Sequence, residues 1–279
     1  MPGRARGAYG WPIKPFGRQH PVRGYLNDPR SGRKLSFHFG IDICAPDGTP
    51  VHAVAPGQVV RESGRAVAVV GATRTFGYWH IVPAVANGEF VAKGQLLGHV
   101  ASTWGHVHFA ERRAGRYRNP LRRGGIHPYA DRTKPTIVSI GFFRRGRALA
   151  PERVNGKVEV IVEAYDTPPR PAPAPWTGLP LTPALIRWRI TRGRRIVVPW
   201  HTAIDSRLVI EPPERIKEVY APGTRQNHPN RAGCYRFYLR RAWRTSQIAD
   251  GEYRFEVAAS DTRGNRTAKA LEFTVANNL

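Results

Sequence analysis

Cysteine, acidic residues and long apolar runs are all scarce in this chain of 279 residues. The two cysteines, Cys44 and Cys234, belong to no C-x-x-C pair, so a cysteine zinc site or a redox motif has no support. No apolar run approaches the ~20 residues of a transmembrane helix. The first residues, MPGRARG, contain no hydrophobic segment of the signal-peptide type. A hydrophobic fraction of 41% still suffices for real cores, and the length suggests about two domains.

The shortage of acidic residues gives a formal net charge of +24, from 44 Lys and Arg against 20 Asp and Glu. This balance favours polyanionic partners such as nucleic acid, anionic lipid or acidic polymers. Most of the basic residues are arginines, spread along both halves without a helix-turn-helix, zinc-finger or RNP-type pattern. We therefore expect no specific nucleic-acid partner. A second interpretation is that arginine replaces lysine through genomic base composition, which would leave the charge with little functional meaning.

Four side chains with matched even spacings are the strongest local signal. His38 and Asp42 stand in FHFGID, and His106 and His108 follow about 65 residues later in HVH. Side chains at i and i+2 or i+4 of an extended segment point to one face, so each pair can converge from one strand. Catalytic zinc usually takes three protein ligands, often two His and one carboxylate, and keeps a position open for water. Three of these side chains thus predict a zinc site, and the fourth remains free to handle protons.

The other histidines and cysteines carry weaker signals. His52 and His99 lie in strand-like runs, where a surface or hydrogen-bonded position is the ordinary outcome. Cys44 follows Asp42 by two residues and has apolar neighbours, so we expect a small packed side chain rather than a nucleophile. The remaining histidines stand beside prolines or in loops, where solvation is the default: His20, His127, His201 and His228.

The surroundings of the four side chains resemble the lysostaphin- or LytM-type zinc metallopeptidases, also called the β-lytic family. Residues 38–60 read HFGIDICAPDGTPVHAVAPGQVV, and members typically show a HxGxD motif, a GTPV turn, an Ala and a GxV strand. Later segments match in the same order: GYWHI at 77–81, VAKGQLLGHV at 91–100, GHVHFAE at 105–111 and NPL at 119–121. The resemblance covers roughly residues 8 to 121.

This resemblance implies roles for five residues. In such enzymes the first His and the Asp of HxGxD, with the second His of HxH, bind zinc, which implies His38, Asp42 and His108 as metal ligands. The first His of HxH and the His of the Y-x-H segment act near the bound water. That implies His106 and His80 as the catalytic residues.

Three departures from the family pattern leave these residues intact. The strand pair at 67–78 is short, and a polar insert at 24–36 precedes the first ligand. Trp104 stands before HxH where the family usually has glycine, which predicts an altered cleft rim. Peptide hydrolysis needs a base, an oxyanion donor and an acid, and a histidine can serve each role because it titrates near neutral pH. We assign these duties jointly to His80 and His106, since the absence of H-E-x-x-H disfavours a glutamate base.

From Lys134 onward, short alternating segments predict antiparallel strands with one buried face. They cover residues 136–143, 157–164, 185–190, 252–259 and 270–275. The last segments resemble the final strands of immunoglobulin-like or fibronectin-type sandwiches, and Gly264 or Asn265 would tolerate a positive φ in the turn DTRGN. The Pro-rich run 167–183 is interpreted as a loop within this sandwich, because neither flank alone could close a core. The domain boundary is expected between Arg122 and Lys134.

We therefore expect an all-β chain with two domains. Residues 8–121 would form a zinc metallopeptidase domain with the barrel-like antiparallel sheet of lysostaphin-like proteins, whose fold is a duplicated hybrid motif. Residues 134–279 would form an Ig-like or fibronectin-like β-sandwich.

The expected function is a zinc-dependent metalloendopeptidase with Zn²⁺ as cofactor, hydrolysing peptide bonds in bacterial peptidoglycan. Its partners would be peptidoglycan peptides and, through the basic surface, anionic wall polymers. Its place would be the cell envelope or the exterior, with the leader missing from this sequence or export by another route. One alternative is a catalytically silent wall-binding or amidase-activating protein, in which zinc ligands are typically replaced. A basic nucleic-acid-binding protein is the second alternative, and the order of the motifs opposes it.

Overall fold

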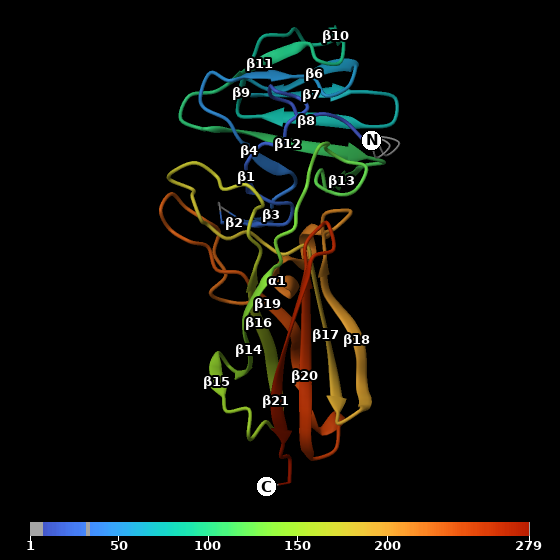
Figure 1. Ribbon diagram of the computed structural model, residues 1–279. Helices are drawn as coiled ribbons and strands as arrows, with labels where there is room; N and C mark the ends of the chain where they lie inside the picture. Colours follow the sequence, from blue (N-terminus) through green and yellow to red (C-terminus); the bar gives the residue numbers. More distant parts are fainter. Residues whose placement is uncertain (1–7, 32–33, 279) are drawn as a thin grey trace.

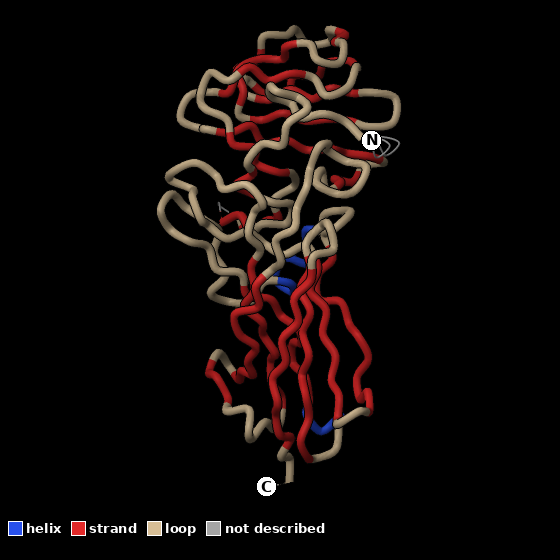
Figure 2. Tube along the Cα trace, in the orientation of Figure 1, coloured by secondary structure: helices blue, strands red, loops and turns tan. Residues whose placement is uncertain are grey.

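The computed structural model describes residues 8–31 and 34–278. Nearly all of its regular structure is β-strand, and the named strands pair in antiparallel fashion, so the all-β prediction is confirmed. The strands are arranged in two parts that stand end to end, with the long strands of the second half of the sequence in the lower part (Figures 1 and 2). Among the described residues, no helix is long and apolar enough to cross a membrane.

The first part is built on an eight-stranded sheet of order β1-β4-β12-β8-β7-β6-β10, with β13 also paired to β12. A three-stranded sheet of order β5-β11-β9 and the β2–β3 hairpin complete it. The strands are β1 Val22–Gly24, β2 Pro29–Ser31, β3 Leu35–Phe37, β4 Ile41–Cys44, β5 Pro50–His52, β6 Gly57–Ser63, β7 Ala66–Val70, β8 Thr75–Trp79, β9 Ile81–Pro83, β10 Phe90–Val91, β11 Leu96–Val100, β12 His106–Arg113 and β13 Arg116–Arg118.

Apolar side chains from both of these sheets share one core. Tyr78 on β8, Phe109 on β12 and Leu97 on β11 are all fully buried in it. Burying a side chain of this size stabilises a fold by roughly 1.5–3 kcal/mol. The hydroxyl of Tyr78 is satisfied inside the core by the backbone N–H of Val54, at 2.9 Å. This packed core holds β8 and β12 rigidly beside each other.

The second part is a β-sandwich of two four-stranded antiparallel sheets, of order β15-β14-β16-β19 and β18-β17-β20-β21. Their inner faces form a second hydrophobic core. Short helical turns lie at 213–215 and 245–247. The strands and the one α-helix are β14 Thr136–Arg144, β15 Arg147–Leu149, β16 Lys157–Tyr165, β17 Leu185–Arg192, β18 Arg195–Asp205, α1 Ile216–Val219, β19 Arg236–Arg244, β20 Gly251–Ser260 and β21 Arg266–Val275.

All five alternating segments predicted from the sequence are strands of this sandwich. The strands β15, β18 and β19 escaped prediction: β15 has only three residues, β18 is a largely exposed edge strand, and the pairing of β19 with β16 is interrupted by register shifts. In the turn between β20 and β21, Gly264 has φ +92°, as that prediction allowed. The Pro-rich run lies between β16 and β17. The Ig-like assignment stays a prediction.

Buried hydrogen bonds fasten the two parts together. The backbone N–H of Thr182 donates to the Asp28 carboxylate at 3.0 Å, and the hydroxyl of Tyr220 donates to the carbonyl oxygen just before Asp28 at 2.7 Å. The parts also exchange side chains, since Phe37 packs in the core of the sandwich and Leu181 in the core of the first part. Loops of the sandwich are thereby held against the edge of the first part.

Candidate metal centre

The register between β4 and β12 brings three of the predicted side chains to one face. Asp42 lies directly opposite His108, and His106 lies opposite Cys44. Opposed residues in antiparallel strands project to the same side of the sheet, and so do residues two apart along a strand. Asp42, His106 and His108 therefore share a face.

His38 does not share a strand with Asp42, so that part of the prediction is wrong. His38 lies in the connection between β3 and β4, and this connection turns its side chain back toward Asp42. The connection passes so close to β12 that a Cβ on Gly40 would lie 2.4 Å from the backbone oxygen of Phe109 and 2.8 Å from Nε2 of His108. The glycine of the HxGxD motif is thus required by a close approach of two backbones.

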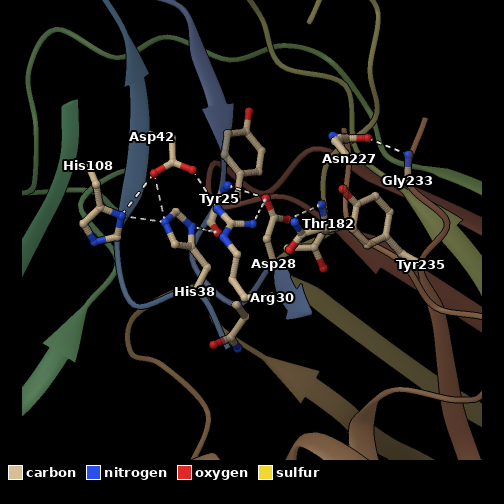
Figure 3. Close-up of polar contacts among 12 residues, drawn as sticks. Tyr25, Asp28, Arg30, His38, Asp42, His108, Thr182, Asn227, Gly233 and Tyr235 are labelled. Carbon is tan, nitrogen blue, oxygen red and sulfur yellow. Dashed lines mark hydrogen bonds and ion pairs between the residues drawn. The ribbon is translucent and has the colours of Figure 1, made fainter. Parts of the chain in front are cut away.

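Three potential ligand atoms converge at this point, as Figure 3 shows. Nε2 of His38 lies 2.7 Å from Nδ1 of His108 and 3.0 Å from Oδ1 of Asp42. Nδ1 of His108 lies 3.1 Å from the same carboxylate oxygen. Tetrahedral zinc with bonds of 2.0–2.1 Å would separate its ligand atoms by about 3.3 Å. The donor set and its spacing fit a divalent metal ion of the zinc type.

Neighbouring groups orient two of these ligands. Nδ1 of His38 is 2.8 Å from the carbonyl oxygen of Tyr25, to which it can only donate, and this leaves Nε2 with its lone pair toward the centre. Nη2 of Arg30 donates to Oδ2 of Asp42 at 2.6 Å and leaves Oδ1 toward the histidines. Nε2 of His108 has no hydrogen-bond partner in the described part of the chain.

Electrostatics also suit a metal site. Burial lowers the pKa of His38, and it lowers the pKa of His108 to about 4, so both rings are neutral near pH 7. Burial by itself would raise the pKa of Asp42, but its interactions with His38, with the positive charge of Arg30 and with the rings of His106 and His108 outweigh it and hold that pKa well below its usual range. Metal ligands must be deprotonated to bind, and all three meet this condition at neutral pH.

The two predicted catalytic histidines border the same space. Nε2 of His106 lies 3.5 Å from Oδ1 of Asp42. The ring of His80 lies 4.7 Å from the ring of His106 and stacks on Trp104 at 3.6 Å. His80 follows β8 with φ +65°, a left-handed conformation that is unusual for histidine. Burial, with His106 and His108 nearby, lowers the pKa of His80 to about 3.

All five residues line one cleft of about 370 Å³. Trp104 lines this cleft with 37% of its surface exposed, and the altered rim expected from the sequence stays a prediction. Sequence reasoning missed other lining residues. Arg23 and Arg30 could not be identified from the sequence, because the residues that they contact are brought to them only by the folded chain. Three further lining residues belong to loops of the sandwich: Trp176, Gln226 and Asn227.

The remaining titratable groups of interest are either hydrogen-bonded or buried in the fold, or lie away from the metal centre. Nδ1 of His52 is 3.1 Å from the carbonyl oxygen of Gly94, and burial raises the pKa of Cys44 to about 12, which makes it an inert thiol. A second cluster of possible ligand atoms escaped sequence reasoning at the junction of the two parts. It consists of Asp131, Asp166 and Asp261.

The fold and this donor set indicate a domain of the metallopeptidase type. Residues 36–120 match the family model "Peptidase family M23", which lies within the predicted resemblance and confirms it. These residues form an M23-family domain. No curated protein matches the chain.

Solved structures of this kind resemble part of the chain. The catalytic domain of a mutant of the prophage-encoded M23 protein EnpA from Enterococcus faecalis is 30% identical over 39% of this chain and 95% of its own, with a TM-score of 0.32. The catalytic domain of lysostaphin from Staphylococcus simulans is 22% identical over 37% and 96%, with a TM-score of 0.32. Helicobacter pylori Csd3 is 24% identical over 42% of this chain, with a TM-score of 0.35, and the match spans 34% of Csd3.

Proposed function

We propose that this protein is a zinc-dependent endopeptidase that hydrolyses peptide bonds in bacterial peptidoglycan. The observation that carries the proposal is the convergence of two neutral histidines and one ionised carboxylate within 3.1 Å of one another, in a cleft of an M23-family domain. Such a donor set is common in catalytic zinc sites, in which three protein ligands leave one position for water.

His38, Asp42 and His108 would hold the metal. When bound, zinc supplies a water that is nucleophilic at neutral pH and polarises the carbonyl of the substrate. His106 and His80 stand beside this position and would share three duties: taking the proton of the water, supporting the oxyanion and protonating the leaving amine. His80 is neutral near pH 7, so its ring can accept a proton at one nitrogen and donate a hydrogen bond from the other.

A basic aromatic surface of the sandwich supports a second element of the proposal, retention on anionic wall polymers. The guanidinium groups of Arg189, Arg187 and Arg266 lie 4.9, 5.4 and 5.6 Å from the ring of Trp200. We call these four residues the Trp200 patch. Arg189 is paired with Glu256, whereas no carboxylate pairs with Arg187 or Arg266 among the described residues. A polyanion would compensate these charges.

The alternatives lead to different expectations. A catalytically silent wall-binding or amidase-activating protein typically lacks one or more zinc ligands, and here the donor set is complete. A nucleic-acid-binding function would rest on net charge alone. The proposed substrate would place the protein in the cell envelope or outside the cell.

The deciding experiment is incubation of the purified protein with peptidoglycan, with and without a chelator, followed by mass spectrometry of released fragments. We expect new amino and carboxyl termini that appear without the chelator, vanish with it and return when zinc is restored. The His108→Ala variant serves as the control for a contaminating hydrolase. Release of fragments that is equal in the variant and the parent would remove this site from the reaction.

A further inference from the structure

The sandwich supplies part of the cleft wall. Trp176, Gln226 and Asn227 line the cleft together with the metal centre, although they belong to the two loops at 167–183 and 221–235. In Figure 1 these yellow and orange loops lie beside β1, β2 and β3. The cleft is therefore built by both parts of the chain.

These two loops are held in place by specific contacts. Asn227 donates from Nδ2 to the carbonyl oxygen of Pro180 at 2.5 Å and accepts from the backbone N–H of Gly233 at 2.6 Å. The hydroxyl of Tyr235 reaches the same carbonyl oxygen at 3.0 Å. Across the junction, the backbone N–H of Ser31 donates to the side-chain oxygen of Gln226 at 3.1 Å. Figure 3 shows part of this network beside the metal centre.

From this loop, the ring of Trp176 contacts Arg23, one of the cations that line the cleft. The guanidinium carbon of Arg23 lies 4.1 Å from the centre of the Trp176 ring, a close cation–π contact. On its other side, Nη2 of Arg23 lies 3.1 Å from the carbonyl oxygen of Trp104 and 2.6 Å from Nδ1 of His106. Within the described chain, no ring contact links Trp176 itself to a histidine of the site.

Arg23 differs from the second cation of the cleft. Arg30 is paired with Asp42, whereas no ion pair joins Arg23 to a carboxylate in the described part of the chain. Among the described residues, the hydrogen bonds of Arg23 use Nη2 alone, which leaves Nη1 and Nε for a ligand. A guanidinium presents its N–H groups as a planar fork that matches a carboxylate. Arg23 is thus a pre-positioned cation that forms no ion pair with any carboxylate of the described residues.

We propose that Arg23, held by Trp176 of the sandwich, binds a carboxylate of the substrate, so that the cleft selects acidic peptides. The inference rests on the proposed endopeptidase function and adds a substrate class to it. Because Arg23 also touches His106, a bound carboxylate would lie within a few ångströms of the reacting groups. The selected carboxylate therefore belongs to a residue close to the scissile bond.

The test compares two forms of one substrate. Soluble stem peptides from peptidoglycan are used as prepared and after conversion of their carboxylates to amides, with the zinc-loaded full chain. The variants are Trp176→Ala, Trp176→Phe and Arg23→Gln, with Phe143→Ala as the matched control for loss of an aromatic ring that stacks on an arginine outside the cleft. We expect Trp176→Ala to raise the KM for the acidic peptides about tenfold, with little change for the amides. Trp176→Phe should recover most of this loss, and Phe143→Ala should show none.

Measurements of peptide binding separate this inference from the proposed function. If no form cleaves either peptide, the proposed function fails, and isothermal titration of the same two peptides still measures the preference for carboxylates. Equal affinity of the parent for both peptides, or equal effects of Trp176→Ala on both, would overturn the inference. So would a gain of activity in Trp176→Ala toward both peptides, because the loop would then obstruct the cleft rather than build it.

Discussion

Arg30 and Asp42 form an ion pair that orients the metal centre, with Nη2 of Arg30 at 2.6 Å from Oδ2 of Asp42. Arg30 lies on β2, in the segment that the sequence marked as a polar insert, and Asp42 lies on β4. The pair packs directly over Gly24, where a Cβ would lie 2.4 Å from Oδ2 of Asp42 and 2.8 Å from Nη2 of Arg30. The insert therefore shapes the site without supplying a ligand.

Zinc content tests the ligand set. We expect elemental analysis to find about one zinc per chain. Asp42→Ala and His38→Ala should each lose most of it, because two remaining ligands leave an incomplete and more solvated site. Asp205→Ala, which removes a carboxylate on the sandwich surface, is the control. Full zinc occupancy in both site variants would refute the assignment.

The Arg30–Asp42 pair predicts an effect of a residue outside the ligand set. Arg30→Gln should weaken zinc affinity about 10–100-fold, because groups that orient a ligand typically contribute this much. Competition with a chromophoric chelator measures the affinity. Arg207→Gln breaks an exposed Arg–Asp pair of the sandwich and should leave it unchanged. Unaltered affinity in Arg30→Gln would mean that Asp42 is oriented by its backbone alone.

Catalysis should be separable from metal binding at His80. His80→Ala is expected to retain zinc and to lose activity by roughly 10²–10⁴-fold, the range for a positioned acid–base group. His106→Ala should behave similarly, with some loss of zinc because His106 lies beside the ligands. Turnover on peptidoglycan and zinc content are measured on the same samples. A variant with parental turnover identifies a histidine that the reaction does not need.

The carboxylate cluster at the junction predicts a pH dependence of stability. Burial, with the charges of Asp131 and Asp261, raises the pKa of Asp166 from 3.8 to about 8. Between these values the folded protein keeps a proton that the unfolded chain has released, so the free energy of unfolding falls as pH rises from about 4 to about 8. The slope is at most about 1.4 kcal/mol per pH unit for one group.

Urea denaturation at pH 5 and pH 8, with chelator present, measures this dependence. Asp166→Asn cannot ionise and should flatten the decline, with higher stability than the parent at pH 8. Glu272→Gln on an exposed strand is the control and should keep the parental decline. An Asp166→Asn variant that declines as steeply as the parent would show that other groups cause it.

Salt should weaken wall binding if the Trp200 patch anchors the protein. Arg187→Glu combined with Arg266→Glu is expected to reduce co-sedimentation with cell walls while zinc content stays unchanged. Binding by the parent should fall steeply above physiological ionic strength, where the Debye length is already about 8 Å. Arg147→Glu combined with Arg145→Glu, on the other sheet, makes the same charge change. An equal loss from both pairs would indicate net charge rather than the patch.

Much of the site could be predicted from contiguous sequence. The even spacing of His106 and His108 and the order of the motifs can be read from short segments of the sequence. The alternation of apolar and polar residues in strands such as 157–164 can be read in the same way. Where the local pattern is weak, prediction failed: β18 is largely exposed, and register shifts interrupt the pairing of β19 with β16. The placement of His38 on the same strand as Asp42 was wrong, because the close approach at Gly40 is a contact between distant strands.

Other features were decided by tertiary structure alone. Arg30 becomes an orienting group because its side chain, on β2, reaches Asp42 on β4, and Arg23 becomes a cation of the cleft because a loop of the sandwich places Trp176 against it. Nothing in the local sequence of these residues distinguishes them from the many other arginines. Their roles come from which groups lie within a few ångströms, and that is set by the packing of two cores and the buried hydrogen bonds at their junction.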